Sequence, residues 1–189
     1  MKPIAIIAGI ILVLAVCGIL LVSGQKEEKS SNDPVRVGMI MIGNRENSSW
    51  NASHWQGIQD AARQLNLTID CRENVLPAEC SQVMEQMVRE GCRIIISTSI
   101  DFEQEVVKTS QHHPDIYFFQ ATGTQSHGNL ASYMGRMYQM RYLAGIAAGR
   151  QAKHHAVGYV TTMEIPEVVR GIDAFALGVR KADPQAMGY

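Results

Sequence analysis

The residues of this chain best suited to binding chemistry are an aromatic side chain and an amide that stand next to each other. Trp50 and Asn51 lie in residues 48–57, which read SSWNASHWQG. An indole face can stack on a flat ring, and an amide can both donate and accept hydrogen bonds. The segment follows an apolar run at residues 35–43 and precedes an amphipathic stretch at residues 56–65, which predicts a strand, a loop and a helix.

A loop at the carboxyl end of the first strand of an α/β sheet is a usual place for a ligand. We therefore interpret Trp50 as a ligand contact, and the alternative is a loop aromatic that folds back onto the sheet. Ser53 and Gln56 fit the S-x-x-Q capping box and predict where the following helix begins. An apolar stripe on that helix is formed by Trp55, Ile58, Ala62 and Leu65. Trp55 is thus predicted to lie in the core, which leaves Trp50 as the ligand candidate.

The rest of the chain alternates between short apolar runs and longer helical patterns. Strands are predicted at residues 35–43, 67–71, 93–98, 116–121, 129–134 and 156–161, and helices at residues 56–65, 78–90, 102–112, 137–149 and 166–181. This alternation predicts an α/β fold with a parallel sheet and helices on both faces. In the fourth of these helices we expect Met140, Leu143, Ala144 and Ala147 to point inward, and the glycines to pack closely against a sheet.

The sequence carries no recognisable catalytic motif. It has no G-x-S-x-G elbow, no phosphate-binding loop and no H-E-x-x-H, and Ser97 and Ser99 follow a strand without a partner base. Cys71, Cys80 and Cys92 are interpreted as buried free thiols, with a Cys71–Cys80 bridge as the alternative. The two adjacent histidine pairs make poor metal sites, because neighbours on a helix point about 100° apart. We therefore predict no enzyme, no cofactor and no metal.

The charge of the chain indicates which partners it lacks, and its first residues indicate its location. Lys plus Arg total 17 and Asp plus Glu total 18, with no basic stripe, which argues against nucleic acid as a partner. Residues 4–22 are apolar without a break, and as a helix they would span about 28 Å, enough to cross a bilayer. Three interpretations of residues 1–24 stay open: an uncleaved membrane anchor, a secretory signal cut after Gly24, and a lipoprotein signal at Cys17. Each predicts an extracytoplasmic protein, with residues 25–34 as a polar tether.

Several segments together resemble one protein family. They are residues 48–57 (SSWNASHWQG), 90–99 (EGCRIIISTS), 113–119 (HPDIYFF), 135–145 (GRMYQMRYLAG), 165–168 (IPEV) and 170–180 (RGIDAFALGVR). In this order they are similar to the BMP (basic membrane protein) family of ABC-transporter substrate-binding proteins, whose characterised members bind nucleosides. The resemblance extends over residues 35–186.

This resemblance implies a type I periplasmic-binding-protein fold, in which two lobes close on a ligand. Residues 35–155 would form the first lobe, and residues 156–189 would begin the second. Trp50 takes the place of the family's stacking phenylalanine, and Asn51 that of its ligand-contacting asparagine. The candidate ligand-binding residues are Trp50, Asn51, Ser97, Ser99, Thr122 and Gly123, gathered at the carboxyl edge of the sheet.

Thr122 stands where the family usually has an aspartate that holds a ribose hydroxyl pair. A threonine cannot accept two hydrogen bonds as a carboxylate does, so a free base or another flat polar solute suits the site as well as a nucleoside. The resemblance implies the solute-binding component of an ABC importer, with a membrane permease as its partner. The alternative is the ligand-sensing ectodomain of a membrane-anchored signalling protein. The sequence reaches only one strand and one helix into the second lobe, and we interpret it as part of a longer protein.

Overall fold

The computed structural model describes residues 33–188. The predicted signal or anchor segment and most of the tether lie outside these residues. Within residues 33–188 no helix combines the length and the apolar character that crossing a membrane requires.

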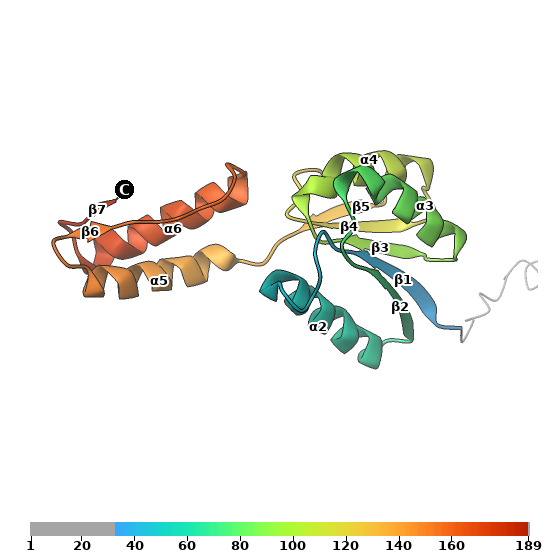
Figure 1. The fold of residues 1–189 in the computed structure, drawn as a ribbon, viewed down its shortest axis with the longest axis horizontal. Helices are drawn as coiled ribbons and strands as arrows, with labels where there is room; N and C mark the ends of the chain where they lie inside the picture. Colours follow the sequence, from blue (N-terminus) through green and yellow to red (C-terminus); the bar gives the residue numbers. More distant parts are fainter. Residues whose placement is uncertain (1–32, 189) are drawn as a thin grey trace, which may run out of the picture. The chain divides into compact units, whose positions relative to one another are not determined.

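A parallel sheet of five strands organises the first part of the chain (Figure 1). The strands are β1 (Val35–Ile40), β2 (Leu67–Arg72), β3 (Ile94–Ser97), β4 (Tyr117–Ala121) and β5 (Leu130–Tyr133). Their order is β2-β1-β3-β4-β5, and every neighbouring pair is parallel. After β1 the chain adds β2 on one side of β1, and it then crosses over to add β3 on the other side. The switch point therefore lies between β1 and β3. The prediction of a parallel α/β sheet is confirmed.

Helices cover both faces of this sheet, and each face has its own core (Figure 1). On one face lies α2 (Ser49–Gln64), above a core of Val37, Met39, Met41 and Ile58. On the other face lie α3 (Cys80–Arg89) and α4 (Glu103–His112), above a larger core that includes Met84, Met87, Ile95, Phe102 and Phe118. Short 3₁₀ turns, η1 (Pro77–Glu79) and η2 (Ile100–Phe102), lead into α3 and α4.

The close approach of α3 to the sheet depends on Gly38 in β1. A Cβ atom at this position would lie 2.6 Å from the sulfur of Met87, which is buried beneath α3. The glycine therefore makes room for a long, flexible side chain that fills the space between helix and sheet.

Helix α2 begins at Ser49, which is earlier than the predicted cap at Ser53. Ser48 is its N-cap, because the Ser48 hydroxyl accepts a hydrogen bond from the Asn51 backbone N–H at 3.3 Å. Ser53 instead donates to the carbonyl oxygen of Ser49, and Gln56 donates to Asp60, so the predicted capping box is wrong. The polar first turns of α2 have no apolar stripe, and the pattern became visible only farther along the helix.

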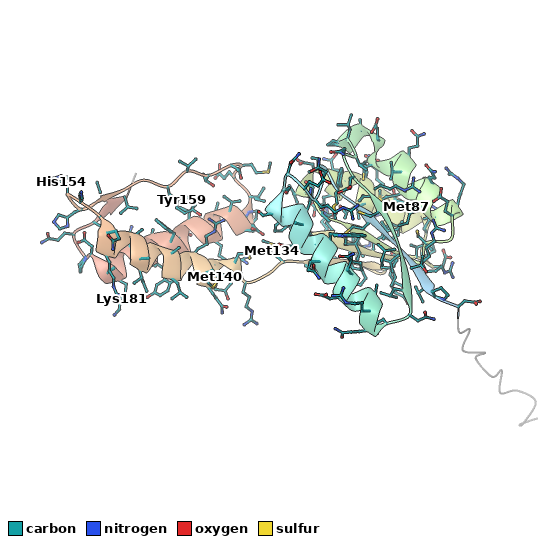
Figure 2. All side chains as sticks on the ribbon, turned by 60° about the horizontal axis from the view of Figure 1, so that its bottom comes forward. Met87, Met134, Met140, His154, Tyr159 and Lys181 are labelled. Atoms are coloured by element: carbon teal, nitrogen blue, oxygen red, sulfur yellow. The ribbon has the colours of Figure 1, made fainter. Side chains whose placement is uncertain are left out.

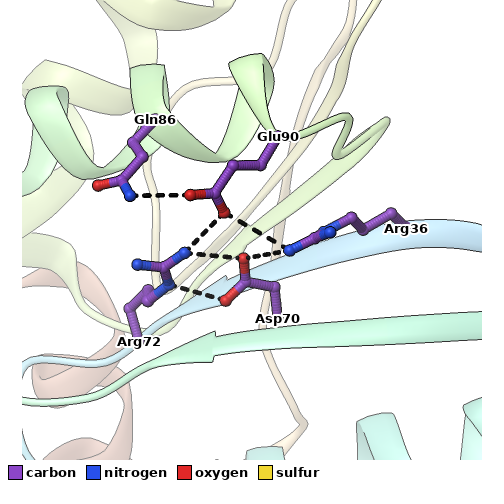
Figure 3. Close-up of polar contacts among 5 residues, drawn as sticks. All are labelled: Arg36, Asp70, Arg72, Gln86 and Glu90. Atoms are coloured by element: carbon purple, nitrogen blue, oxygen red, sulfur yellow. Dashed lines mark hydrogen bonds and ion pairs between the residues drawn. The ribbon is translucent and has the colours of Figure 1, made fainter.

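The edge strand β2 is tied to β1 and α3 by a cluster of charged side chains (Figure 3). Asp70 and Arg72 of β2 meet Arg36 of β1 and Glu90 at the end of α3. Gln86 of α3 completes the cluster by donating to Glu90 Oε1 at 2.8 Å. Positive and negative groups alternate in it, so each carboxylate has at least one guanidinium partner.

The remaining elements form a helix pair with a short two-stranded sheet. They are α5 (Met137–Gln151), β6 (Ala156–Val157), α6 (Pro166–Ala182) and β7 (Met187–Gly188), and β6 pairs in parallel with β7. The backbones of α5 and α6 touch at two glycines. A Cβ atom at Gly145 would lie 2.1 Å from the Phe175 carbonyl oxygen, and one at Gly178 would lie 2.1 Å from the Tyr142 carbonyl oxygen.

Two predictions for α5 are therefore wrong. Its glycines do serve close packing, but the partner is helix α6 and not a sheet. The face predicted to point inward is exposed, with Met140 at 64% and Leu143 at 54% of full exposure. Met140 is labelled in Figure 2. Apolar residues occur on all sides of α5, so their spacing does not show which side is buried. Its glycines mark the buried side instead, because the smallest residues allow the closest approach of another helix.

Candidate functional site

The structure brings all six candidate ligand-binding residues to the carboxyl edge of the sheet. Trp50 and Asn51 lie in the first turn of α2, just after β1, and Ser97 and Ser99 lie at the end of β3. Thr122 and Gly123 follow β4. Because β1, β3 and β4 are adjacent strands, this edge includes the switch point of the sheet, where ligands of such folds bind.

Trp50 is half-buried, and its orientation is fixed by polar contacts. Its indole Nε1 donates to the carbonyl oxygen of Thr98 at 2.7 Å. The ring of His54, one turn later in α2, lies 4.5 Å from the Trp50 ring between centroids, tilted by 56°. His54 Nδ1 is 2.9 Å from the Trp50 carbonyl oxygen, which makes this nitrogen the donor.

The Trp50 ring lines an apolar groove of about 730 Å³ on the α2 face of the sheet. His54, Ile58, Ile96, Phe119 and Tyr133 also contribute to its walls. Tyr133, at the end of β5, lies 6.0 Å from His54 between ring centroids. Burial raises the pKa of the Tyr133 hydroxyl to about 12, so this group stays protonated at neutral pH. The groove therefore offers ring faces and aliphatic surface rather than charge.

Asn51 is buried, and both ends of its amide lie against protein groups. Its Nδ2 donates to the carbonyl oxygen of Asn44 at 3.3 Å, and its Oδ1 lies 3.5 Å from the Thr98 hydroxyl oxygen. The side chain thus links the loop after β1 to the end of β3.

The two serines at the end of β3 have different surroundings. Ser97 is fully buried, and its hydroxyl has no hydrogen-bond partner in the structure. Ser99 caps η2, since its hydroxyl accepts from the Asp101 backbone N–H at 3.3 Å and donates to the Asp101 carboxylate at 3.0 Å. Ser99 is half-buried and closer to solvent, which leaves it the more accessible of the two.

Gln120 of β4 is in register with Ser97 on the neighbouring strand and is buried at this part of the edge. Its Nε2 donates to the carbonyl oxygens of Ser99 at 2.6 Å and Ala121 at 2.9 Å. Its Oε1 is buried without a partner, as is the Ser97 hydroxyl. These two unpaired polar atoms therefore belong to paired residues of adjacent strands, near the carboxyl ends of β3 and β4.

Thr122 and Gly123 form a tight corner between β4 and β5. Thr122 has a φ of 62°, in the left-handed region, and its hydroxyl donates to the Ala121 carbonyl oxygen at 2.5 Å. A Cβ atom at Gly123 would lie 2.5 Å from the hydroxyl oxygen of Ser132 and 2.6 Å from Gln120 Cγ, so a larger residue would force these side chains to shift. Glu103, the first residue of α4, holds the corner by accepting hydrogen bonds from the backbone N–H groups of Thr124 and Gln125.

Sequence reasoning missed Thr98, His54 and Tyr133. Thr98 stands between the two candidate serines, and its side chain and carbonyl both contribute to the edge. The start of α2 at Ser49 places His54 one turn after Trp50, which the predicted start at Ser53 does not. Trp55 packs against the α2-side core as predicted, and the guanidinium of Arg45 lies 4.1 Å above its ring centroid.

The described part of the chain contains no group of three or more His, Cys, Asp or Glu side chains arranged to hold a metal ion. Cys71, Cys80 and Cys92 are free thiols, so the alternative of a Cys71–Cys80 bridge is not realised. Burial raises the pKa of the Cys71 thiol to about 11 and that of Cys80 to about 12, which keeps both in the unreactive thiol form.

Comparison with known proteins gives the family. The sequence profile described as ABC transporter substrate-binding protein, PnrA-like, matches residues 34–187, nearly the whole described chain. A Haloferax volcanii protein with the provisional name ABC transporter glucose-binding protein TsgA13 is 34% identical over 158 residues, covering 83% of this chain and 40% of that protein. A purine-binding protein of Brucella abortus is 30% identical over 157 residues, covering 82% and 45%. This chain thus spans less than half the length of these two relatives.

Solved structures share the fold. An ABC transporter solute-binding protein of Aeropyrum pernix has a TM-score of 0.69 and 21% identity, covering 80% of this chain and 44% of that one. The counterpart from Conexibacter woesei has a TM-score of 0.63 and 20% identity, covering 82% and 53%. These likenesses confirm the periplasmic-binding-protein type of fold. From the profile match over residues 34–187, we conclude that the chain belongs to the Bmp family of PnrA-like ABC-transporter substrate-binding proteins.

Proposed function

We propose that the protein is the extracytoplasmic solute-binding component of an ABC importer and that its solute is a flat, polar ring compound, either a purine or a nucleoside. The observation that carries this proposal is the Trp50 ring, which is half-exposed and held at the switch-point edge by its bond to Thr98. A flat ring can stack on such an indole face, with roughly 1 to 3 kcal/mol of binding free energy per stacked base.

The relatives support the class of protein more than the identity of the solute. One is named for purine binding and the other for glucose binding, so the family profile alone does not select a ligand. We favour the purine class because the groove beside Trp50 is lined by aromatic and aliphatic side chains, which suit a heterocycle better than a ring of hydroxyl groups.

The same proposal includes the arrangement of the whole protein. Residues 35–155 would form the first lobe and residues 156–189 the beginning of the second, with the ligand bound where the lobes meet. Residues 1–24 would direct the chain to or across the membrane, and a membrane permease would receive the solute. No catalytic step is part of this function.

Sensing is the second candidate, because the unbroken apolar segment at residues 4–22 suits a permanent anchor. A binding lobe held by an anchor can report its ligand to a signalling module instead of a permease. The coding sequence after residue 189 separates the two: a second lobe followed by a stop favours import, and a second membrane span followed by a cytoplasmic module favours sensing.

Titration of the detergent-solubilised chain with adenine, adenosine and glucose, followed by NMR of the tryptophan indole N–H groups, tests the site. We expect adenine and adenosine to shift the Trp50 signal and glucose to leave it unchanged. Trp50→Ala should weaken purine binding roughly 5- to 150-fold, and Trp50→Phe, which keeps a ring, should weaken it much less. Shifts with glucose alone would contradict the purine class, and shifts with none of the three would remove Trp50 from the site.

A further inference from the structure

We propose that Thr98 is a positioning residue, which fixes the Trp50 ring so that it presents only a face to the ligand. This role rests on the proposed function, and it limits Trp50 to stacking on the ligand without a hydrogen bond from the indole.

Thr98 links the end of β3 to both β1 and α2. Its backbone N–H and its hydroxyl both donate to the carbonyl oxygen of Ile40, at 3.2 and 3.1 Å, which fastens the end of β3 to the end of β1. Its own carbonyl oxygen accepts the indole N–H of Trp50 at 2.7 Å, which fastens the first turn of α2 to the same point. Thr98 is buried, so water has little access to its hydroxyl and its carbonyl oxygen.

Asn51 supports this arrangement from the other side. The Thr98 hydroxyl lies 3.1 Å from the Ile40 oxygen and 3.5 Å from Asn51 Oδ1, and its single proton serves the nearer acceptor better. Asn51 Nδ2 meanwhile holds the loop after β1 through Asn44. Asn51 thus lies between the loop after β1 and the end of β3, and we assign it to the support of Trp50 as well.

The consequence for recognition follows from the occupied indole N–H. A ligand acceptor could take this donor only by displacing the Thr98 carbonyl, which would leave a buried oxygen without a partner. The His54 ring, tilted against Trp50, restricts the approach further. Trp50 thus reads the flatness of a ring and not its hydrogen-bonding pattern. Adenine and hypoxanthine, which differ only at the ring edge, should gain equally from this contact.

The first test needs no ligand. In the full chain we expect the Trp50 indole N–H to exchange slowly with water, and we expect Thr98→Val, which removes the hydroxyl at nearly constant volume, to make this exchange at least about tenfold faster. Thr98→Ser should retain slow exchange. Thr109→Val makes the same change at a buried threonine of α4 and should leave the Trp50 signal unchanged, whatever its effect on melting temperature. Unchanged exchange in Thr98→Val would overturn the proposal.

The second test uses adenine as the probe. If Thr98 acts through Trp50, Thr98→Val should weaken adenine binding in the parent chain but have no further effect in a Trp50→Ala background. Additive losses would show that Thr98 acts on the ligand by another route and would overturn the positioning role. If adenine fails to bind the parent chain, the purine assignment falls, and the exchange experiment still decides whether Thr98 positions the ring.

Discussion

Arg72 and Asp70, two residues apart on β2, form a two-pronged ion pair in which the arginine Nε donates to Oδ1 at 2.7 Å and Nη2 donates to Oδ2 at 3.0 Å. Alternate residues of a strand point to the same face, which is why this spacing allows both contacts. Arg36 adds a third bond to the same carboxylate at 3.1 Å. These hydrogen bonds, of which that from Arg72 has the largest effect, lower the pKa of Asp70 from 3.8 to about 2.

Asp70→Asn should destabilise the sheet. The amide keeps the size of the side chain but loses the charge, and it leaves two guanidinium groups with weaker partners. We expect a loss of about 1 to 3 kcal/mol in the free energy of unfolding, measured by urea denaturation. Asp115→Asn is the matched control, because the Arg93–Asp115 pair is exposed on both sides, at 61% and 62%, and should change stability by less than about 0.5 kcal/mol. Equal losses in the two variants would contradict this account of the cluster.

The same carboxylate predicts acid sensitivity. Because its pKa in the folded chain is below the ordinary value, Asp70 contributes stability that is fully present above about pH 4 and is lost as the pH falls to about 2. Because water screens this partly exposed carboxylate, the contribution stays below about 2 kcal/mol. Urea midpoints measured between these two pH values should therefore fall more steeply in the parent chain than in Asp70→Asn. Parallel curves would assign the acid sensitivity to other groups.

Gly145→Ala should separate α5 from α6. The added Cβ would meet the Phe175 carbonyl oxygen at 2.1 Å, and backbone cannot move aside as a flexible side chain can. We expect a loss of about 1 to 3 kcal/mol, seen as faster amide hydrogen exchange in both helices. Gly57→Ala in α2 provides the contrast, since nothing lies within 4 Å of its added Cβ. That change should be neutral or stabilise α2 by up to about 1 kcal/mol.

Thiol labelling should follow burial. In a Cys17→Ser background, we expect the half-buried Cys71 to react with a disulfide reagent before the buried Cys80 and Cys92, and all three to react slowly at pH 8. The raised pKa values of these thiols give the reason, since the thiolate is the reactive form. Rapid labelling of Cys80 in the folded chain would contradict the buried position that the structure assigns to it.

Much of the sheet could be predicted from the sequence because its strands carry strong local patterns. The β-branched run Ile94–Ser97 indicates a buried parallel strand by itself. The start of α2 could not be predicted in the same way, because its first turns are polar and the Ser48 cap competes with Ser53 as a candidate. The buried side of α5 depends on glycines that meet a distant helix, and such contacts leave no periodic signal in the chain.

The candidate site, too, could be predicted only in part from the sequence. The sequence identified the right edge of the sheet, because strand ends and the aromatic residue could be located along the chain. It did not identify Thr98, since the importance of this residue comes from its carbonyl oxygen and from a neighbour 48 positions away. Backbone acceptors are present at every residue, so only the folded structure shows which of them a side chain uses.

Oxidation of the methionines in the two cores can report how often the fold opens to solvent. Met39, Met41, Met84 and Met87 are almost completely buried, whereas Met140 and Met163 are exposed. Oxidants of an extracytoplasmic environment reach the exposed sulfurs directly and convert them to sulfoxides. The buried sulfurs are reached only when the sheet and its helices separate. The ratio of inner to outer oxidation in a recovered sample therefore reports how often the fold has opened during its exposure.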